Sequence, residues 1–171
     1  MLSSSRITLR APEPIDVDTL YRWENDPDVW CVGNTIAPYS RKQLWEYIDT
    51  YEADIFKSRQ LRFMIELNEG KVPVGTVDLF DFDPVNSRCG LGILVLPYFR
   101  ERGIALEAIS LVVEYCRIRL SLHQLYCTVA DSNLPSRQLF KSAGFAISGR
   151  LRSWLREAGR YEDAYIYQKL L

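Results

Sequence analysis

The sequence has few of the residues that metal sites and disulfides require. Its 171 residues include one histidine, His123, and four cysteines without a Cys-x-x-Cys pair. Zinc sites need paired cysteine and histidine ligands, so we expect no metal. The cysteines are expected to be reduced, mostly buried thiols of a cytoplasmic protein. They are Cys31, Cys89, Cys116 and Cys127.

Strong net charge and long apolar runs are also missing. Lysine and arginine total 21 against 22 aspartate and glutamate residues, which gives a net charge of -1. Because nucleic-acid-binding domains are usually basic, we expect no nucleic-acid partner. No stretch approaches the roughly 18 apolar residues of a membrane span, and residues 1–6 lack the apolar core of a secretory signal. We therefore expect neither secretion nor a membrane partner.

The chain does contain enough apolar residues for one folded domain, which we expect to span residues 1–171. Hydrophobic residues make up 47% of the sequence, and a chain of this size buries roughly two-thirds of its unfolded surface. Periodicity predicts elements in the order β-α-α-β-β-β-α-β-α-β-β. That order favours an α/β (α+β mixed) fold with a mixed sheet and helices on both faces.

Individual segments support this order. A capping box of Ser40 and Gln43 predicts the start of the second helix, with Leu44 and Ile55 on one face. Seven strands are expected. Their ranges are 6–10, 61–67, 72–80, 92–96, 123–129, 145–151 and 161–170.

The most informative stretch is residues 96–105, which joins a short apolar strand to a helix over residues 104–120. That helix is apolar almost all round, so we expect it to be largely buried. Its start carries the pattern Arg-x-x-Gly-x-Ala from Arg100 to Ala105. Successive backbone N–H groups at a helix start attract anions, and Gly103 lets a ligand come close. The turn is therefore a candidate phosphate site.

A second motif follows the strand over residues 123–129. Asn133 is a favourable N-cap, Pro135 suits the first helical turn, and Gly144 suits the residue after the helix. The segment also carries Ser136 and Phe140 at helical spacing from Asn133. A short helix over residues 134–143 is predicted.

The two motifs, in this order and at this separation, resemble the GNAT family of N-acetyltransferases over nearly the whole chain. Residues 149–163 are similar to the subgroup of spermidine and ribosomal-protein alanine acetyltransferases. The resemblance implies a central, mostly antiparallel mixed sheet whose strands splay around a CoA site. It also implies direct attack by an amine in a ternary complex.

Acetyl-CoA is the co-substrate that the resemblance implies. The backbone amides of the turn would bind its pyrophosphate, with charge added by Arg100 or Arg102, and the strand before the turn would pair with the pantetheine arm. For Asn133 a pure helix cap is an equally good interpretation. The residues expected to bind the cofactor are Leu94, Val95, Leu96, Arg100, Arg102, Gly103, Ile104, Ala105, Asn133, Ser136 and Phe140.

The catalytic acid and base depart from the family pattern. Phe140 stands where many members have a tyrosine that protonates the thiolate, so Ser136, water or no dedicated acid remain as alternatives. Gly90 stands where the spermidine enzymes often have glutamate. Asp78 and Asp81 could act as base through a water, or could belong to a solvated acidic loop.

The acceptor pocket of the family is formed by the first two helices, their loop and the last hairpin. Four aromatic residues are expected there with nearby carboxylates, which would suit a cationic amine. The alternatives are core aromatics and a solvated acidic face. The aromatic residues are Trp30, Tyr39, Trp154 and Tyr161. The loop over residues 32–36 lacks the acidic pair of the polyamine enzymes, which weakens the case for spermidine.

Together these features predict an enzyme, an N-acetyltransferase that uses acetyl-CoA and acts on a primary amine. A polyamine or a protein N-terminus is the favoured acceptor, so the expected partner is a small-molecule amine or a peptide N-terminus. Acetylation of an amino sugar or antibiotic is one alternative, and an acyl-CoA-binding sensor without turnover is another. A homo-oligomer is also left open.

Overall fold

The computed structural model describes residues 2–27, 29, 36–157 and 159–171, apart from the side chain of Glu157. Residues Met1–Arg10 and Asp54–Leu171 form one compact unit, and Ala11–Ala53 form another. The single domain over residues 1–171 stays a prediction. Among the described residues, no helix has both the length and the apolar character needed to cross a membrane.

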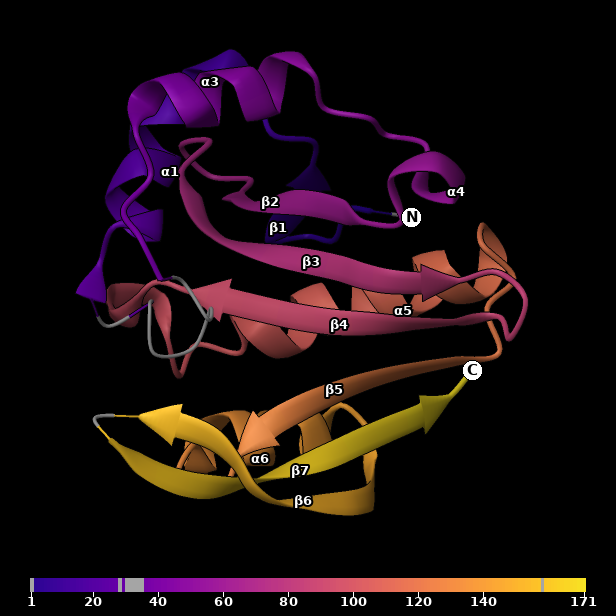
Figure 1. The fold of residues 1–171 in the computed structure, drawn as a ribbon. Coiled ribbons are helices and arrows are strands. Elements are labelled where there is room, and N and C mark those ends of the chain that lie inside the picture. The colour runs from indigo at the N-terminus through magenta and orange to yellow at the C-terminus, as the bar shows by residue number, and fades with distance from the viewer. Residues whose placement is uncertain (1, 28, 30–35, 158) are drawn as a thin grey trace. The chain divides into compact units, whose positions relative to one another are not determined.

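The larger unit is built on a seven-stranded sheet with the order β1-β2-β3-β4-β5-β7-β6 (Figure 1). Its neighbours pair antiparallel except β4 and β5, which run parallel. The mixed, mostly antiparallel sheet confirms the predicted architecture. The strands are β1 (Ile7–Arg10), β2 (Leu61–Leu67), β3 (Pro73–Asp83), β4 (Arg88–Val95), β5 (Gln124–Ala130), β6 (Ala146–Glu157) and β7 (Arg160–Leu170).

The parallel pair is short and then opens. β4 and β5 pair only from Arg88 opposite Gln124 to Gly90 opposite Tyr126 within the described strands. Beyond that point β4 stays paired with β3 as far as Val95, while β5 continues along β7. Figure 1 shows the gap widening toward the arrowhead of β4. The predicted splay of strands is confirmed.

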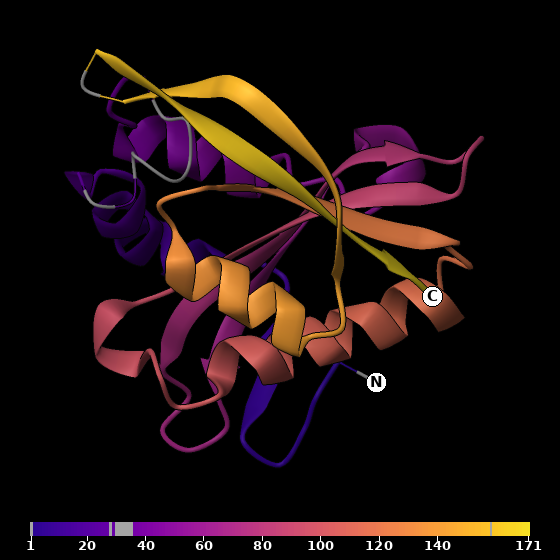
Figure 2. The same ribbon diagram turned by 90° about the horizontal axis from the view of Figure 1, so that it is seen from below.

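Two helices of this unit cover one face of the sheet (Figure 2). They are α5 (Ile104–Ile118) and α6 (Leu134–Ser142), and a short 3-10 turn, η2 (Pro97–Phe99), leads from β4 into the loop before α5. On α5 only one face is buried, because Leu106 and Ile118 are 36% and 47% exposed. The expectation of a largely buried helix was wrong for its outer face.

The described cysteines are buried thiols, two on strands β4 and β5 and one on helix α5. Cys89, Cys116 and Cys127 are free and buried, as predicted, whereas Cys31 lies outside the described residues. Burial raises the pKa of Cys89 and of Cys127 to about 12. These thiols therefore stay protonated at neutral pH.

The smaller unit contains η1 (Pro14–Asp16), α1 (Val17–Glu24) and α3 (Arg41–Asp49), and α1 packs against α3. Arg41 links the two helices, since its Nε lies 2.7 Å from Asp18 Oδ1 and its guanidinium lies 4.0 Å from the ring centre of Tyr21. The predicted capping box is confirmed by hydrogen bonds in both directions between Ser40 and Gln43.

Ile55 does not belong to the same helix as Leu44, so that part of the prediction was wrong. α3 ends at Asp49, where the Thr50 hydroxyl donates to the Glu46 carbonyl at 2.7 Å. A separate turn, α4 (Ile55–Ser58), begins because the Asp54 carboxylate accepts from the Phe56 N–H at 3.0 Å. A new N-cap therefore starts a separate turn, although the apolar spacing continues past Asp49.

Candidate active site

The turn before α5 presents unpaired backbone donors. Gly103 is the N-cap of α5 with φ +77°, a conformation that favours glycine. Within the described chain, the N–H groups of residues 102–105 donate to no protein acceptor, while the Glu107 N–H returns to the Gly103 carbonyl at 3.1 Å. Such donors attract anions together with the helix dipole, and the binding of a phosphate here stays a prediction.

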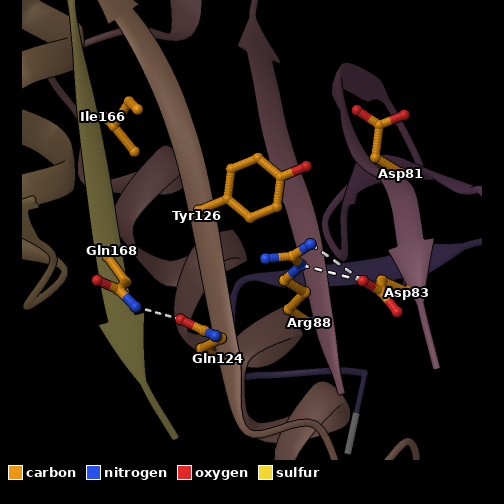
Figure 3. Close-up of a pocket in the computed structure, with 7 residues that line it drawn as sticks. All are labelled: Asp81, Asp83, Arg88, Gln124, Tyr126, Ile166 and Gln168. Carbon is orange, nitrogen blue, oxygen red and sulfur yellow. Dashed lines mark hydrogen bonds and ion pairs between the residues drawn. The ribbon is translucent and has the colours of Figure 1, made fainter. Parts of the chain in front are cut away.

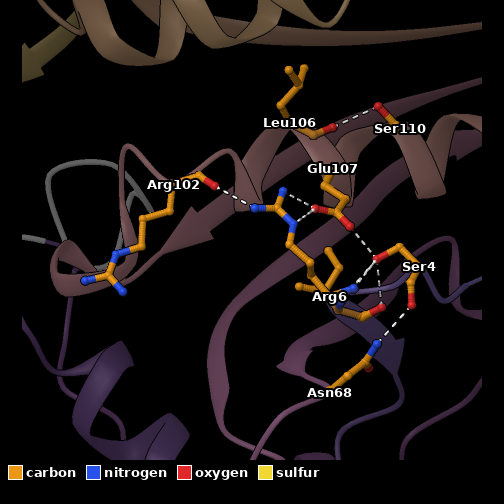
Figure 4. Close-up of polar contacts among 8 residues, drawn as sticks. Ser4, Arg6, Asn68, Arg102, Leu106, Glu107 and Ser110 are labelled. Atoms are coloured by element: carbon orange, nitrogen blue, oxygen red, sulfur yellow. Dashed lines mark hydrogen bonds and ion pairs between the residues drawn. The ribbon is translucent and has the colours of Figure 1, made fainter.

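Arg6, just before β1, fixes this turn from the other end of the chain (Figure 4). Its Nη1 donates to the Arg102 carbonyl at 3.0 Å, and its Nε donates to the Glu107 carboxylate at 2.7 Å. The Ser4 hydroxyl also donates to Glu107. A β-carbon at Gly103 would lie 3.4 Å from Arg6 Nη2, so the guanidinium lies directly beside the turn.

The two arginines of the motif have different surroundings. Arg100 Nε donates to the Val95 carbonyl at 2.8 Å, which ties the turn to the end of β4. The Arg102 guanidinium lies 4.8 Å from the ring centre of Tyr98 and 5.7 Å from that of Phe99. Arg102 is therefore held on an aromatic surface next to the free N–H groups.

Residues 94–96 offer a backbone edge to the opening between β4 and β5. On one side they follow β3, since Leu94 pairs with Thr76, Val95 pairs with Gly75, and the Leu96 N–H donates to the Val74 carbonyl at 2.9 Å. On the side of β5 they have no strand partner in the described sheet. An extended ligand with amide groups could pair with this edge.

A cavity of about 520 Å³ lies over the short paired segment of β4 and β5 (Figure 3). Gln124 and Tyr126 alternate along β5 with the buried residues Leu125 and Cys127, so they point away from the buried face. The seven lining residues are Asp81, Asp83, Arg88, Gln124, Tyr126, Ile166 and Gln168.

Tyr126 and Asp81 form a polar pair in this cavity. Both line the cavity, and the pKa of the Tyr126 hydroxyl is raised by burial first and by the charge of Asp81 second. Asp81 has φ 49°, an unusual backbone conformation for a residue other than glycine. Asp81 lies near the end of β3, and its carboxylate lines the cavity from that strand.

Comparison with known proteins decides the family. The model of the acetyltransferase (GNAT) domain matches residues 6–146 of the chain. The protein belongs to the GNAT acetyltransferase family. As a GNAT acetyltransferase it is an enzyme of the acyltransferase class, which confirms the prediction made from its two motifs.

Similar proteins align with nearly the whole chain. The uncharacterized N-acetyltransferase p20 of Bacillus licheniformis is 29% identical over 99% of this chain and 95% of its own length. Spermidine N(1)-acetyltransferase of Escherichia coli K12 is 26% identical over 96% of this chain and 86% of its own length. The structure of spermidine N-acetyltransferase from Vibrio cholerae with CoA and spermine has a TM-score of 0.86 at 24% identity and covers 98% of this chain and 96% of that one. The GNAT-like fold is thereby confirmed.

In this GNAT chain the second motif forms a capped helix. The Asn133 side chain accepts from the Ser136 N–H at 3.1 Å and caps α6. Phe140 is buried and contacts Phe145, with 5.2 Å between ring centres. The cofactor contacts expected for these residues, and the acid role of Ser136, stay predictions.

The two candidate bases differ in their surroundings. Asp78 lies in the middle of β3, where Arg62 of β2 donates to it at 2.6 Å. To take a proton, Asp78 would have to give up this ion pair. Asp81 has no ion-pair partner in the described chain and lines the cavity. Asp81 is therefore the better placed of the two.

The Phe80 ring explains why residue 90 is a glycine and not a larger residue. Phe80 lies opposite Gly90 on β3, and a β-carbon at Gly90 would come within 2.3 Å of its ring. The same ring is 6.4 Å from that of Tyr126. Phe80 thus fills the space that a side chain at Gly90 would need. No spacing in the sequence indicates this contact, and the residue type of Tyr126 predicts only a strand.

The predicted acceptor aromatics fall into separate parts of the chain. Trp154 and Tyr161 lie on the β6–β7 hairpin and are 60% and 64% exposed. Tyr39 belongs to the unit of residues 11–53 and its N–H donates to Asn25. Trp30 lies outside the described residues. Their role as a common pocket stays a prediction.

Two exposed carboxylates, one on α3 and one just before α4, lie near lysine side chains. Glu46 lies 3.5 Å from Lys42, and Asp54 lies 3.7 Å from Lys57. Among the described residues, no group of three or more His, Cys, Asp or Glu side chains could hold a metal ion.

Proposed function

We propose that this GNAT protein transfers an acetyl group from acetyl-CoA to a primary amine. The observation that carries the proposal is the turn of unpaired N–H groups at α5 beside a strand edge without a partner, on a chain of this family. The turn would hold the pyrophosphate through Arg102, Gly103, Ile104 and Ala105. The edge over Leu94–Leu96 would pair with the amides of the pantetheine arm.

The remaining cofactor residues support the same placement. Arg100 and Arg102 would add positive charge near the phosphates. Asn133, Ser136 and Phe140 would line the arm from the side of α6. Because the thioester would then lie in the opening between β4 and β5, an acceptor would reach it from the cavity at the closed end of that opening.

The chemistry requires a neutral amine and a stabilised thiolate. Asp81, facing the cavity, would take the proton of the ammonium directly or through a water, and Asp78 would be the weaker candidate. Ser136 would protonate the leaving thiolate. Since a thiol has a pKa near 8.5, water could replace that acid at a modest cost in rate.

The favoured acceptors are a polyamine or a peptide N-terminus, with an amino sugar or antibiotic as the alternative. Trp154 and Tyr161, on the β6–β7 hairpin, would contribute to the acceptor pocket. The similarity to spermidine N(1)-acetyltransferase supports a small amine. A homo-oligomer and a cytoplasmic location remain part of the proposal.

A second function, an acyl-CoA-binding sensor without turnover, is favoured by Phe140 and Gly90, which lack the usual acid and base. Thiol release from acetyl-CoA separates the two functions. The transferase should release CoA faster with at least one primary amine among polyamines, basic peptides, amino acids and amino sugars. Binding of acetyl-CoA with no amine-dependent thiol release would favour the sensor.

A further inference from the structure

The cavity between β3, β4, β5 and β7 contains one charge of each sign available to a ligand. Asp81 is the available carboxylate, because it has no ion-pair partner in the described chain. The second carboxylate, Asp83, is already occupied. It accepts from the N–H groups of Val85 and Asn86 at 3.1 and 3.0 Å and from the Asn86 amide at 2.7 Å. These bonds, led by that of the Asn86 side chain, lower the pKa of Asp83 and keep it charged.

Arg88 supplies the positive charge. Its Nε and Nη2 lie 3.2 and 3.1 Å from one carboxylate oxygen of Asp83, which anchors the guanidinium. Figure 3 shows the other edge of the guanidinium turned toward Tyr126 and Gln124, on the cavity side. A guanidinium has five N–H donors, so this second edge can still bind an anion in bidentate fashion.

The two charges are arranged along the opening in a definite order. Arg88 pairs with Gln124 at the closed end, whereas Tyr126, whose hydroxyl is turned toward Asp81 in Figure 3, lies opposite Gly90 where the strands part. The Gln168 amide donates to Gln124 and adds neutral polar groups beside Arg88. An ammonium would therefore lie nearest the opening, and an anion deeper in the cavity.

We infer that the acceptor is a small zwitterion, an amino acid whose ammonium contacts Asp81 and Tyr126 and whose carboxylate contacts Arg88. A polyamine brings several ammonium groups and no anion, so its second charge would meet the guanidinium. The cavity volume of about 520 Å³ leaves room for an amino-acid side chain along Ile166. This inference rests on the proposed acetyltransferase function and narrows its acceptor.

The test compares amines that differ only in a carboxylate. Leucine is paired with isoamylamine, phenylalanine with phenethylamine, and lysine with cadaverine, and kcat/KM is measured with acetyl-CoA. At least one amino acid should exceed its decarboxylated partner by tenfold or more. Arg88→Met should raise the KM of that amino acid at least tenfold and change the KM of the partner amine less than twofold. Arg88→Lys should restore part of the preference.

Arg150→Met is the matched control. Arg150 is also half-exposed and paired with an aspartate, Asp163, on the β6–β7 hairpin outside the cavity. It should leave the preference for the carboxylate unchanged. Melting temperatures identify any variant that fails to fold. If Arg88→Met is unfolded, Arg88→Lys is compared with the unmodified protein instead.

The outcomes separate this inference from the function on which it rests. If amines are acetylated and the carboxylate makes no difference, the zwitterion assignment is overturned and the acetyltransferase stands. If no amine is acetylated, the proposed function fails. In that case, ligand-observed NMR of the same pairs with the CoA-bound protein tests the zwitterion site by binding alone. Preferential binding of the amino acid that is lost in Arg88→Met supports the site. Equal binding of the amino acid and its partner amine refutes it.

Discussion

Replacing Arg6 with methionine should loosen the turn that we assign to the pyrophosphate. The guanidinium bonds to the Arg102 carbonyl and to the Glu107 carboxylate, and its side chain is 54% exposed while that of Glu107 is 19% exposed. A half-exposed ion pair contributes about 0.5–1 kcal/mol and a hydrogen bond about 1 kcal/mol net. The free energy of unfolding should therefore fall by about 1–2 kcal/mol.

The effect on CoA binding is the informative part. Without Arg6, the N–H groups of residues 102–105 lose the contact that orders them before the ligand arrives, and a positive charge beside Gly103 is removed. A loss of about 1 kcal/mol in binding corresponds to roughly fivefold weaker CoA. Titration calorimetry with CoA measures this directly, and a thermal melt of the same samples measures stability.

Arg10→Met is the control, because Arg10 lies on β1, which follows Arg6 directly, and its Nε is 2.5 Å from Glu66, away from the turn. It should lower stability by a similar amount and leave the Kd for CoA within twofold. Equal weakening of CoA by both variants would refute a specific role of Arg6. Unchanged CoA affinity in a destabilised Arg6→Met protein would refute it as well.

Three further predictions concern the chemistry and the core. If Ser136 is the acid, Ser136→Ala should lower kcat by roughly 10²-fold in steady-state kinetics with little change in the KM for acetyl-CoA. Phe140→Tyr should keep or raise the rate. A full rate in Ser136→Ala would remove the serine from the mechanism. Asp81→Asn should lower kcat by 10²-fold or more in steady-state kinetics; an unchanged kcat would exclude Asp81 as the base. Cys89 and Cys127, whose pKa values are raised by burial to about 12, should react with a thiol reagent at neutral pH only after unfolding; rapid labelling of the folded protein would contradict their burial.

Local signals made parts of this protein predictable. Gly103 and the capping box of Ser40 and Gln43 act within a few residues, so their residue types alone indicate a helix start. The boundary at Ile55 was missed because Asp54, a cap of the next turn, lies inside a stretch whose apolar spacing suits one long helix. The early part of β4 was missed because Gly90 and Gly92 weaken the strand pattern.

The cavity could not be predicted because distant pairings assemble it. Arg88 meets Gln124 only through the parallel register of β4 and β5, and Phe80 reaches Gly90 only through the register of β3 and β4. No sequence spacing encodes either contact. The sequence does show the alternation of β5, because the polar residues Gln124 and Tyr126 stand between positions that are buried.

Transfer of a labelled acetyl group tests the central claim most directly. The protein is mixed with acetyl-CoA that carries ¹³C at the acetyl carbonyl and with the amine panel, and the carbonyl resonance is followed by NMR. We predict that the thioester signal is replaced by an amide signal only when protein, acetyl-CoA and a primary amine are all present, with one free CoA thiol for each amide formed. A signal that stays at the thioester position with every amine, or that moves only to free acetate, would contradict the assignment of this protein as an N-acetyltransferase of a primary amine.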